Sequence, residues 1–493
     1  MKKTIKNSLF AVCLLVMGSS CKKYLDVNPD MRTEINTVEK LGQLLVTAYP
    51  DRNYYTFTEV ASDNAEDKTS GFSTHVNEPF PTLYNWNVVV GTGNGTPSEY
   101  WNACYRAIAA ANQALEVIRD NNFGTAANQY KGEALVARAY AEFMLVTFFS
   151  PAYVIGGDNS GLGVPYPLTP ETVTRPVYER GTVASTYAQI EKDLEEGLPL
   201  LVGAKYQVPH YHFTEQAAHA FAARFYIFKG EWDKVITHAN AIYTDGNYKA
   251  NIRQYTGSLY NLTFAEHPVE YTKAEKSWNL LLANTYSVFQ RSTGATRARY
   301  SFGETVRNYF SASTVFGASF RNRLGTNGGA PNYTTNKFNE YFYITNTQSN
   351  TGLPYIMAPI LTADEALLNR AEAYIQKQDY TNAIKDLNDF ASTRIVSYNV
   401  NTHGLTVAKA KAYFNLTDDK QAMIQALLQT KRIAFLQEGI RWMDILRYKL
   451  PVKHNFIAAD GTETFQTLSA DDPRRAFQIP QDAIAAGITP NPR

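Results

Sequence analysis

A repeated segment constrains the fold of this chain more than any other sequence feature. The stretch 223–236 (ARFYIFKGEWDKVI) aligns without a gap with the stretch 371–384 (AEAYIQKQDYTNAI), which begins 148 residues later, at 371 rather than 223. Both copies share an alanine, a Tyr-Ile pair, a lysine and a final isoleucine at matching positions. Each copy indicates two helices joined by a polar turn, with an aromatic residue (Trp232 or Tyr380) opening the second helix.

This pattern is typical of tetratricopeptide-like αα-hairpins, in which small residues let two helices cross closely and an aromatic ring fills the gap. Asn240 and Asn388 extend the match, and the first copy is rich in alanine (Ala217, Ala218, Ala220, Ala222 and Ala223). One such hairpin cannot bury its apolar stripe alone, so a chain that contains two should contain more. Two unrelated amphipathic hairpins are the alternative, which the ungapped match disfavours. The repeat therefore predicts a mainly α fold.

Helix-start signals place further helices on both sides of the repeat. Thr96-Pro97-Ser98-Glu99 combines an N-cap threonine, a proline at the first helical position and a glutamate three residues after the cap. Thr362-Ala363-Asp364-Glu365 has the same capping pattern and opens the second copy. The apolar pattern predicts helices within 37–49, 98–119, 130–149, 182–200, 214–243 (two helices) and 421–448.

Two long stretches lack helical periodicity and are predicted to be irregular. Residues 51–97 are rich in Asn, Thr, Ser, Gly and aromatics and are interpreted as loops. Residues 250–360 are rich in Tyr, Asn, Thr and Arg, and a loop region of that length is usually functional. The expected organisation is one domain with an N-terminal helical repeat part (37–249, carrying the insertion 51–97), an irregular subdomain on the ligand face (250–360) and a C-terminal helical repeat part with a tail (361–493).

The start of the chain has the features of a bacterial secretion signal. Three lysines among the first six residues precede the apolar run 9–17, and small residues lead from this run to Cys21. The run is too short to span a bilayer. Small residues before a cysteine predict that Cys21 is the lipid-modified first residue of a lipoprotein, with 1–20 as its leader and 21–36 as a tether. Cleavage and free secretion is the alternative.

Charge and composition exclude several classes of protein. Lys and Arg (47) balance Asp and Glu (46), and the net charge of +1 argues against nucleic-acid binding by a basic surface. The 33 tyrosines are unusual, and such enrichment often accompanies contact surfaces because the ring packs while its hydroxyl still forms hydrogen bonds. The three cysteines match no disulfide or zinc pattern, and Cys104 is expected to be a small buried apolar residue.

The sequence contains no motif typical of catalysis or of cofactor binding. The glycine-rich loop 91–95 lacks the Lys-Ser/Thr that follows in a phosphate-binding loop. The histidines at 210 and 212 lack a third ligand at suitable spacing and are expected to be a surface pair. Asp63, Glu66 and Asp67 gather oxygen ligands that could hold calcium, but their spacing matches no known calcium loop, so a solvated acidic turn is the main expectation.

A charged segment near the C-terminus is interpreted as structural. Glu438, Arg441, Asp444 and Arg447 are three residues apart, which predicts an alternating charge ladder along one helix face. Gly439 inside that helix would cost about 1 kcal/mol relative to alanine, so it indicates tight packing of the backbone.

Short motifs spread along nearly the whole chain form a set that is specific only when taken together. They are Cys21 with Tyr24-Leu25-Asp26, then Trp101, Tyr105, Ile108 and Asn112, Arg138-Ala139, Gly163-Val164-Pro165, Asp193-Leu194, Ala371-Glu372-Ala373, Glu438-Gly439-x-Arg441 and Ile479-Pro480. In these motifs and their order the chain resembles the SusD/RagB family of outer-membrane lipoproteins of Bacteroidetes.

The resemblance implies a tetratricopeptide-like αα-superhelix with an irregular, loop-rich subdomain packed on it. Members of the family cover a SusC-like TonB-dependent transporter in the outer membrane and capture a nutrient, commonly an oligosaccharide, before import. Capture rests on aromatic platforms that stack on sugars and on polar side chains that bind hydroxyls, and it breaks no bond and needs no cofactor. The resemblance therefore implies a binding protein anchored by lipid in the outer membrane and exposed at the cell surface.

Ligand contacts are expected in the irregular segments, where aromatic and polar residues are not needed for helix packing. The candidates are Tyr84, Asn85, Trp86, Trp278, Tyr286 and Arg291, and the alternative for each is packing in the core. Trp101, Trp232 and Trp442 lie in predicted helices and are assigned to packing. A peptide ligand, a glycosidase with unrecognised carboxylates and an adaptor that binds only proteins remain alternative functions.

Overall fold

A computed structural model describes residues 35–69, 76–173, 177–288, 297–326 and 328–493. The predicted leader, Cys21 and Arg291 lie outside these residues. Within the described part of the chain, no helix is both long and apolar enough to cross a membrane.

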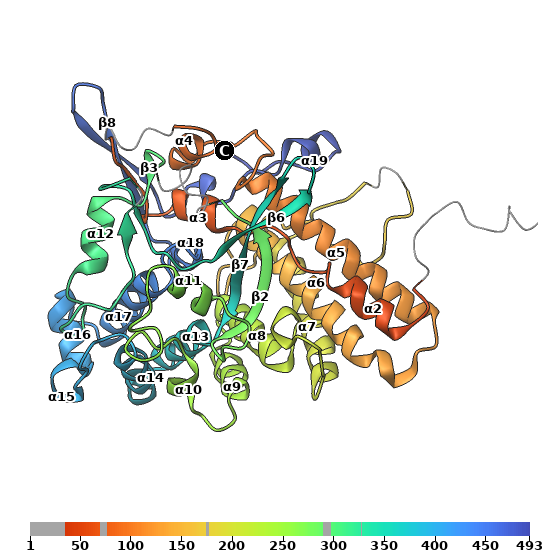
Figure 1. Ribbon diagram of the computed structural model, residues 1–493, viewed down its shortest axis with the longest axis horizontal. Helices are drawn as coiled ribbons and strands as arrows, with labels where there is room; N and C mark the ends of the chain where they lie inside the picture. Colours follow the sequence, from red (N-terminus) through yellow and green to blue (C-terminus); the bar gives the residue numbers. More distant parts are fainter. Residues whose placement is uncertain (1–34, 70–75, 174–176, 289–296, 327) are drawn as a thin grey trace, which may run out of the picture.

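Pairs of helices joined by short connections form the scaffold of the structure, and they follow one another in chain order across Figure 1. The long helices are α5 (Pro97–Asp120), α6 (Asn128–Phe149), α7 (Val183–Gly197), α8 (Glu215–Lys229), α9 (Trp232–Ile242), α13 (Ala363–Gln376), α14 (Tyr380–Ser392) and α17 (Asp419–Ala434). Their sides facing one another are apolar, and alanines of α8 such as Ala218 and Ala222 are fully buried where helices approach. The predicted mainly α, tetratricopeptide-like architecture is confirmed.

The two copies of the repeat are the hairpins α8–α9 and α13–α14. Both helices of the second hairpin begin 148 residues after their counterparts, as the bounds above show. Thr214 and Thr362 cap α8 and α13 in the same way, since each hydroxyl accepts a hydrogen bond from the third backbone N–H of its helix. The gapless repeat in the sequence is therefore a repeat in the structure.

The turn inside each hairpin requires a left-handed backbone at one position. This position is Gly230 in the first hairpin (φ +74°) and Gln378 in the second (φ +61°). Glycine adopts this conformation without a steric penalty, whereas another residue loses about 1–2 kcal/mol. The second copy therefore carries a local strain that the first copy lacks.

A buried polar contact also occurs twice between the stacked helices. In each case an arginine donates two hydrogen bonds of 2.6–2.9 Å to an aspartate on the following helix, and a third of 2.7 Å to an asparagine on the preceding helix. Such bidentate pairs fix the orientation of one helix relative to the next, because the planar guanidinium fits both carboxylate oxygens. The two sets are Asn112, Arg138 and Asp193, and Asn240, Arg370 and Asp386.

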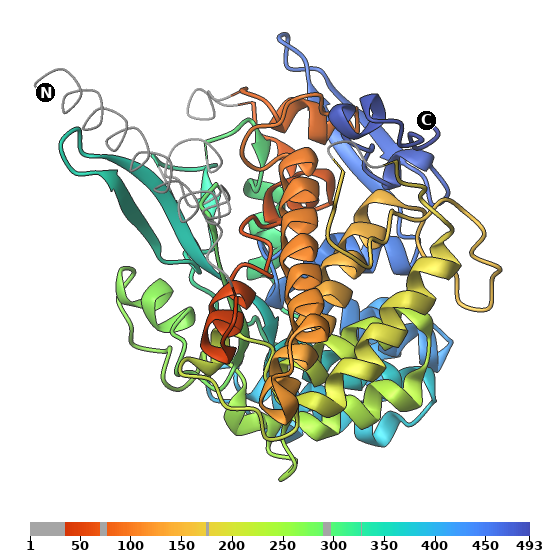
Figure 2. The ribbon, with the colours of Figure 1, turned by 90° about the vertical axis from the view of Figure 1, so that its right-hand side faces the viewer.

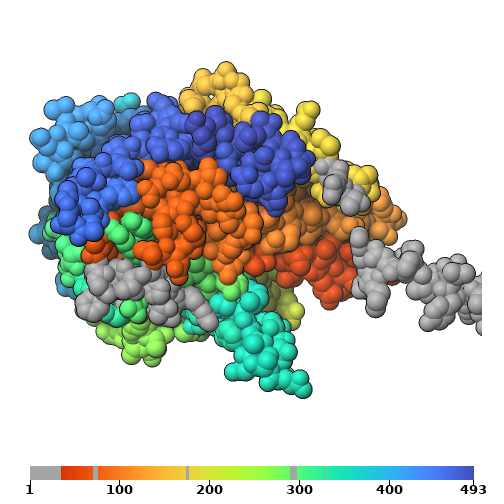
Figure 3. All heavy atoms as spheres, turned by 90° about the horizontal axis from the view of Figure 1, so that it is seen from above, coloured from red at the N-terminus to blue at the C-terminus, as the bar shows by residue number. Residues whose placement is uncertain are grey.

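A three-stranded antiparallel sheet lies across the helices, in the order β2 (Asn279–Tyr286), β7 (Thr351–Thr362) and β6 (Glu340–Asn346). The prediction that 250–360 is irregular is wrong in this part. The apolar residues of β2 form a nearly continuous run without alternation, and β7 contains Pro354 and Pro359, which argue against a central strand. Figures 2 and 3 show the β6–β7 hairpin projecting from the body of the molecule.

Shorter elements complete the structure. The other helices are α2 (Val38–Leu45), α3 (Tyr55–Ala61), α4 (Phe80–Tyr84), α10 (Tyr248–Asn251), α11 (Glu266–Tyr271), α12 (Glu304–Ser311), α15 (Val400–His403), α16 (Val407–Phe414), α18 (Ile440–Arg447) and α19 (Gln481–Ala485), with 3₁₀ turns η1 (Gly124–Ala127), η2 (Leu198–Leu201), η3 (Pro209–Tyr211) and η4 (Pro473–Arg475). The other strands are β1 (Glu66–Asp67), β3 (Tyr300–Ser301), β4 (Gly325–Thr326), β5 (Tyr333–Thr334), β8 (Val452–Ile457) and β9 (Glu463–Leu468).

The segment 51–97, predicted as loops, contains two of these helices. Every residue of α3 is buried, including Thr56, Thr58 and Glu59. A helix that is buried on all sides shows no amphipathic period, and this one mixes polar with apolar residues, so the sequence pattern did not reveal it.

The predicted continuous helix 421–448 is broken into α17 and α18. Gln437 (φ +64°) and Gly439 (φ +74°) take left-handed conformations between them. A Cβ atom on Gly439 would lie 2.6 Å from the ring of Tyr54 and 2.7 Å from the hydroxyl of Thr58, so only glycine fits against α3. The expected tight packing is present, but Gly439 precedes α18 instead of lying inside a helix.

The predicted charge ladder is present only in part: Arg447 pairs with Asp444 at 3.4 Å, but the main partners of these side chains lie on other elements. Arg441 pairs with Asp63 at 2.8 Å, Asp444 pairs with Lys431 at 2.7 Å, and Arg447 binds Glu372. These contacts connect α18 to α17, to α13 and to the segment after α3.

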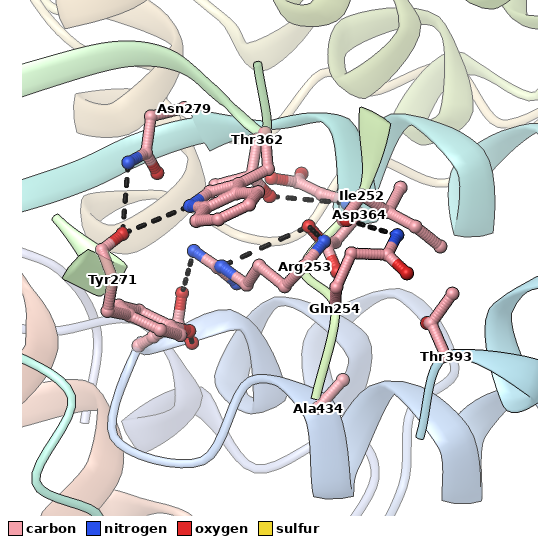
Figure 4. A network of polar contacts seen from close by, with 12 residues as sticks. Ile252, Arg253, Gln254, Tyr271, Asn279, Thr362, Asp364, Thr393 and Ala434 are labelled. Atoms are coloured by element: carbon pink, nitrogen blue, oxygen red, sulfur yellow. Dashed lines mark hydrogen bonds and ion pairs between the residues drawn. The ribbon is translucent and has the colours of Figure 1, made fainter. Parts of the chain in front are cut away.

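Glu438 joins the helices to the segment that carries the sheet. Lys337 and the Tyr271 hydroxyl each donate to Glu438 Oε1 at 2.7 Å, and Arg253 reaches Oε2 at 3.4 Å. The Arg253 guanidinium lies 4.1 Å from the centre of the Tyr271 ring and also faces Asp364 in the first turn of α13, as Figure 4 shows. All five side chains are at least nine-tenths buried, so this network is shielded from solvent.

Exchanging the residues at the hairpin turns provides a test of the strain in the second repeat. Gln378→Gly should stabilise the protein by about 1 kcal/mol because it relieves the left-handed conformation, and Gly230→Ala should destabilise it by about 1–2 kcal/mol. Midpoints of urea unfolding measure both effects. A destabilising effect of Gln378→Gly would contradict the assigned turn geometry.

Removing the charge of Glu438 tests the buried network. Glu438→Gln leaves Arg253 and Lys337 without their shared carboxylate and should cost about 3–5 kcal/mol, whereas Glu39→Gln on the exposed face of α2 should be neutral. Burial raises the pKa of Glu438, but Arg253 and Lys337 outweigh it and hold the pKa below its ordinary value of 4.5.

Because the folded pKa is lowered, the stabilising effect of Glu438 is complete above pH 4.5 and declines as the pH falls through the folded value. The difference between Glu438→Gln and the wild type in urea unfolding should therefore shrink in acid. A difference that is equal at pH 7 and pH 3, or absent at pH 7, would contradict the network.

Candidate functional site

Three tyrosines form a row across the sheet, one on each strand. Tyr286 on β2 and Tyr341 on β6 are both the direct neighbours of Tyr355 on β7 in the strand register. Directly opposed side chains lie on the same face of a sheet. The ring centres of Tyr286 and Tyr355 are 5.9 Å apart, and those of Tyr355 and Tyr341 are 6.1 Å apart. All three are half-buried, so each ring is both supported and accessible; these residues are called the tyrosine row.

The face that carries the tyrosine row continues toward the tip of the β6–β7 hairpin. Tyr343 and Leu353 oppose each other two residues further along, and side chains two residues apart share a face. Tyr343 is 60% exposed and Leu353 is 37% exposed. On the opposite face of β6, Phe342 is 44% exposed. The projecting hairpin thus presents aromatic surface on both sides.

A charged cluster lies at the Tyr286 end of the row. The Arg52 guanidinium lies 5.2 Å from the centre of the Tyr286 ring, and its Nε donates to Glu99 at 2.6 Å. The Asp51 carboxylate, half-exposed, accepts hydrogen bonds from Arg52 at 2.8 Å and from Arg106 at 2.7 Å. Cations and carboxylates at the edge of an aromatic surface supply donors and acceptors for a polar ligand.

Hydrogen bonds between the segment 51–53 and the end of β2 hold this cluster against the sheet. The Asn53 amide donates to the Thr285 hydroxyl at 2.9 Å and to the Tyr286 carbonyl at 3.1 Å, and the Tyr286 N–H donates to the Asp51 carbonyl at 3.3 Å. The segment 51–53 therefore lies beside the end of β2, which explains why Arg52 reaches the tyrosine row. At the other end, the Tyr341 hydroxyl donates to Asn284 Oδ1 at 2.5 Å.

Among the residues predicted to bind ligand, Tyr84 and Trp86 do not offer a face to solvent. Tyr84 is 0% exposed and Trp86 is 5% exposed. Both rings stack on the buried imidazole of His454, at 3.9 and 4.4 Å between ring centres. Neither ring can stack on a sugar in this structure, so their prediction as stacking platforms is wrong. Asn85 between them is half-buried, and its amide donates to the carbonyl of Pro81 at 2.8 Å.

The remaining predicted residues have different outcomes. Trp278 is 4% exposed, and its indole N–H donates to the carbonyl of Tyr271 at 3.2 Å, so it too is a core residue. Tyr286 belongs to the tyrosine row, which keeps it as a candidate. Arg291 lies outside the described residues. Sequence reasoning did not select Tyr341 and Tyr355, although the run of aromatic and β-branched residues 341–345 (YFYIT) is typical of a strand.

The acidic residues considered for calcium are bound to other side chains. Asp63 accepts from both Arg441 and Arg432, and although its burial raises the pKa, these arginines lower it to about 2. Asp67 accepts from Arg299 at 2.7 and 2.8 Å and is buried. Neither the calcium set nor the solvated turn describes these residues, and the described residues contain no group of three or more metal ligands.

Glu66 is held by α12, where its carboxylate accepts the backbone N–H of Thr305 at 3.0 Å. The histidines at 210 and 212 also point to separate partners, the carbonyl of Asn279 and the carboxylate of Glu133. As expected, Cys104 is buried.

Comparison with known proteins identifies the family. A family model described as "Starch-binding associating with outer membrane" matches residues 23–227, and a second, described as "SusD family", matches residues 245–485. A search among curated proteins found no match.

Solved structures share the fold over nearly the whole chain. A SusD superfamily protein from Bacteroides thetaiotaomicron has 21% identity and a TM-score of 0.64, and the match covers 92% of this chain and 98% of that one. A SusD-like carbohydrate-binding protein from Bacteroides vulgatus has 16% identity and a TM-score of 0.62, with 91% and 96% covered. Family membership indicates a binding protein and not an enzyme. The chain belongs to the SusD/RagB family.

Proposed function

We propose that this protein captures a nutrient glycan on the tyrosine row and delivers it to a SusC-like TonB-dependent transporter of the outer membrane. The observation that carries the proposal is the register of the sheet, which brings Tyr286, Tyr355 and Tyr341 into one accessible line. A line of rings suits an extended oligosaccharide, because successive sugar rings have apolar faces that stack on aromatic rings.

The charged cluster beside the row supports the same ligand class. Arg52, Asp51 and Arg106 offer both donors and acceptors at one end of the row, and Asn284 offers an amide at the other. Sugar hydroxyls both donate and accept, so a mixed set of this kind recognises them better than a cluster of a single charge. The near-neutral composition of the chain is consistent with an uncharged ligand.

The predicted leader and lipid anchor support the proposed location in the outer membrane. The basic start, the apolar run 9–17 and Cys21 support lipidation, and two or more acyl chains hold a protein stably in a membrane. An anchor at Cys21 with a tether to residue 36 would keep the binding face close to a transporter in the same membrane.

Single substitutions in the tyrosine row should weaken glycan binding without unfolding the protein. Tyr355→Ala removes the central ring and should reduce affinity about tenfold or more, because each stacked ring contributes roughly 1–2 kcal/mol. Phe342→Ala is the matched control, since it removes an exposed ring from the opposite face of the same hairpin. Affinity electrophoresis of residues 22–493 through gels containing different polysaccharides measures the effect.

The same mixtures should be assayed for new reducing ends. Retardation in one gel, lost in Tyr355→Ala and retained in Phe342→Ala, is the expected result, with no cleavage. Equal retardation of both variants would contradict the assigned face. Retardation in none of the gels would remove the support for a glycan ligand and favour a peptide.

Replacing the proposed lipidation site tests the anchor. Cells that produce Cys21→Ala should incorporate no radiolabelled fatty acid into this protein, because the thiol that carries the acylglycerol is missing. Cys13→Ala, within the predicted leader, should keep the label. A label that persists in Cys21→Ala, or a wild type without label, would contradict lipidation at this residue.

A further inference from the structure

A small pocket lies on a part of the molecule that shares no residue with the tyrosine row. It is bounded by the segment 320–324, the end of α17 and the residues Lys337 and Arg394. Its volume is about 30 Å³, which leaves room for about two atoms the size of a water oxygen. Four of the side chains that line it are cationic, and none is acidic; it is called the basic pocket, and its cations are Arg321, Arg323, Lys337 and Arg394.

Two of these cations already have carboxylate partners behind the pocket. Lys337 pairs with Glu438 at 2.7 Å, and Arg394 pairs with Asp364. Lys337 also donates to the carbonyls of Ala434 and Leu436, so its three donors are satisfied. Lys337 and Arg394 therefore line the pocket, but carboxylates already neutralise their charges.

Arg321 and Arg323 differ, because neither forms an ion pair with any residue that the structure describes. Their Nη2 groups donate to backbone carbonyls, Arg321 to Tyr260 at 3.4 Å and Arg323 to Tyr260 at 2.6 Å and Leu259 at 3.2 Å. The Tyr260 ring supports Arg321, with its centre 4.3 Å from the guanidinium carbon. Two positive charges are therefore held in place without a negative partner.

The Nε atoms of both arginines are buried, and no residue in the described part of the chain accepts a hydrogen bond from them. Buried donors without acceptors are rare in folded proteins, because desolvation costs free energy that only a partner returns. The positive character extends behind the pocket. The pKa of the buried His267 imidazole is lowered to about 4, mainly by burial; Arg323 and Lys337 contribute to this decrease, and a hydrogen bond with the backbone of Asn336 opposes it.

We propose that the basic pocket binds a carboxylate group. A carboxylate is planar, presents two acceptor oxygens to the guanidinium fork and supplies the negative charge that Arg321 and Arg323 lack. Its size agrees with the pocket, which is too small for a whole sugar ring. A small free acid and an acidic sugar both carry such a carboxylate group, and either could supply it. The basic pocket shares no residue with the tyrosine row and would be a second site.

Thermal unfolding of residues 22–493 with sodium acetate, sodium glucuronate or sodium chloride at equal ionic strength tests this proposal. A ligand that binds only the folded state raises the unfolding temperature in a saturable manner. Acetate, glucuronate or both should do so, and chloride and neutral glucose should not. A response to acetate alone would assign a small free acid, and a response to glucuronate alone would assign an acidic sugar.

Variants distinguish the basic pocket from other sites. Arg323→Gln and Arg321→Gln should each weaken the carboxylate response about tenfold or more, because each removes a charged donor. Arg321→Lys keeps the charge but lacks the planar fork, so it should weaken the response while preserving the fold. Arg119→Gln on the exposed surface of α5 is the matched control and should respond as the wild type does.

Two results would overturn the proposal. One is the absence of any saturable response of the wild type to either carboxylate. The other is a response of unchanged strength in Arg321→Lys and Arg323→Gln. Because the basic pocket and the tyrosine row consist of different residues, the outcome of the Tyr355→Ala test of glycan binding is separate from these two results.

Discussion

The buried carboxylate of Glu438 is the interaction on which the arrangement of this protein depends most. It lies between α17 and α18, and its partners Arg253, Tyr271 and Lys337 all come from the long segment between the two copies of the repeat. The helices would stack without that segment, because each hairpin buries its own apolar faces against the next. The sheet belongs to an insertion of more than a hundred residues. It packs on α8, where Arg224 donates to the carbonyl of Ile360 on β7, and the Glu438 network joins the segments that flank its strands to α17 and α18.

This connection determines where the candidate site lies. Glu438 binds Tyr271 and Lys337, which precede β2 and β6 in the chain, and Asn53 binds the last residues of β2. The segment 51–53 in turn leads into the buried helix α3, against which Gly439 packs. Arg52 is thereby positioned beside Tyr286, and the register of three strands positions the other two rings. The proposed site is thus assembled from parts that are distant in sequence, on a scaffold of repeated hairpins.

The helical part of the fold could be predicted from the sequence, because its information is local. The repeat, the capping threonines Thr214 and Thr362 and the amphipathic periods each report a feature within a few residues. The buried helix α3 and the proline-containing strand β7 carried no such signal. For the site, an aromatic residue in an irregular segment indicates an important contact, but it does not indicate whether the ring faces the core or the solvent. Trp86 and Trp278 are buried in the core, and Tyr286 stays a candidate. The tyrosine row depends on a pairing between strands that no local pattern specifies.

A crystal structure of the protein bound to an oligosaccharide, chosen from a polysaccharide that retards the protein in gels, would test the tyrosine row as the binding face. We expect sugar rings stacked along Tyr286, Tyr355 and Tyr341, with hydroxyls bound by the cluster of Asp51 and Arg52. Ligand density on another surface, with the tyrosine row free, would contradict the assignment of this sheet as the binding face.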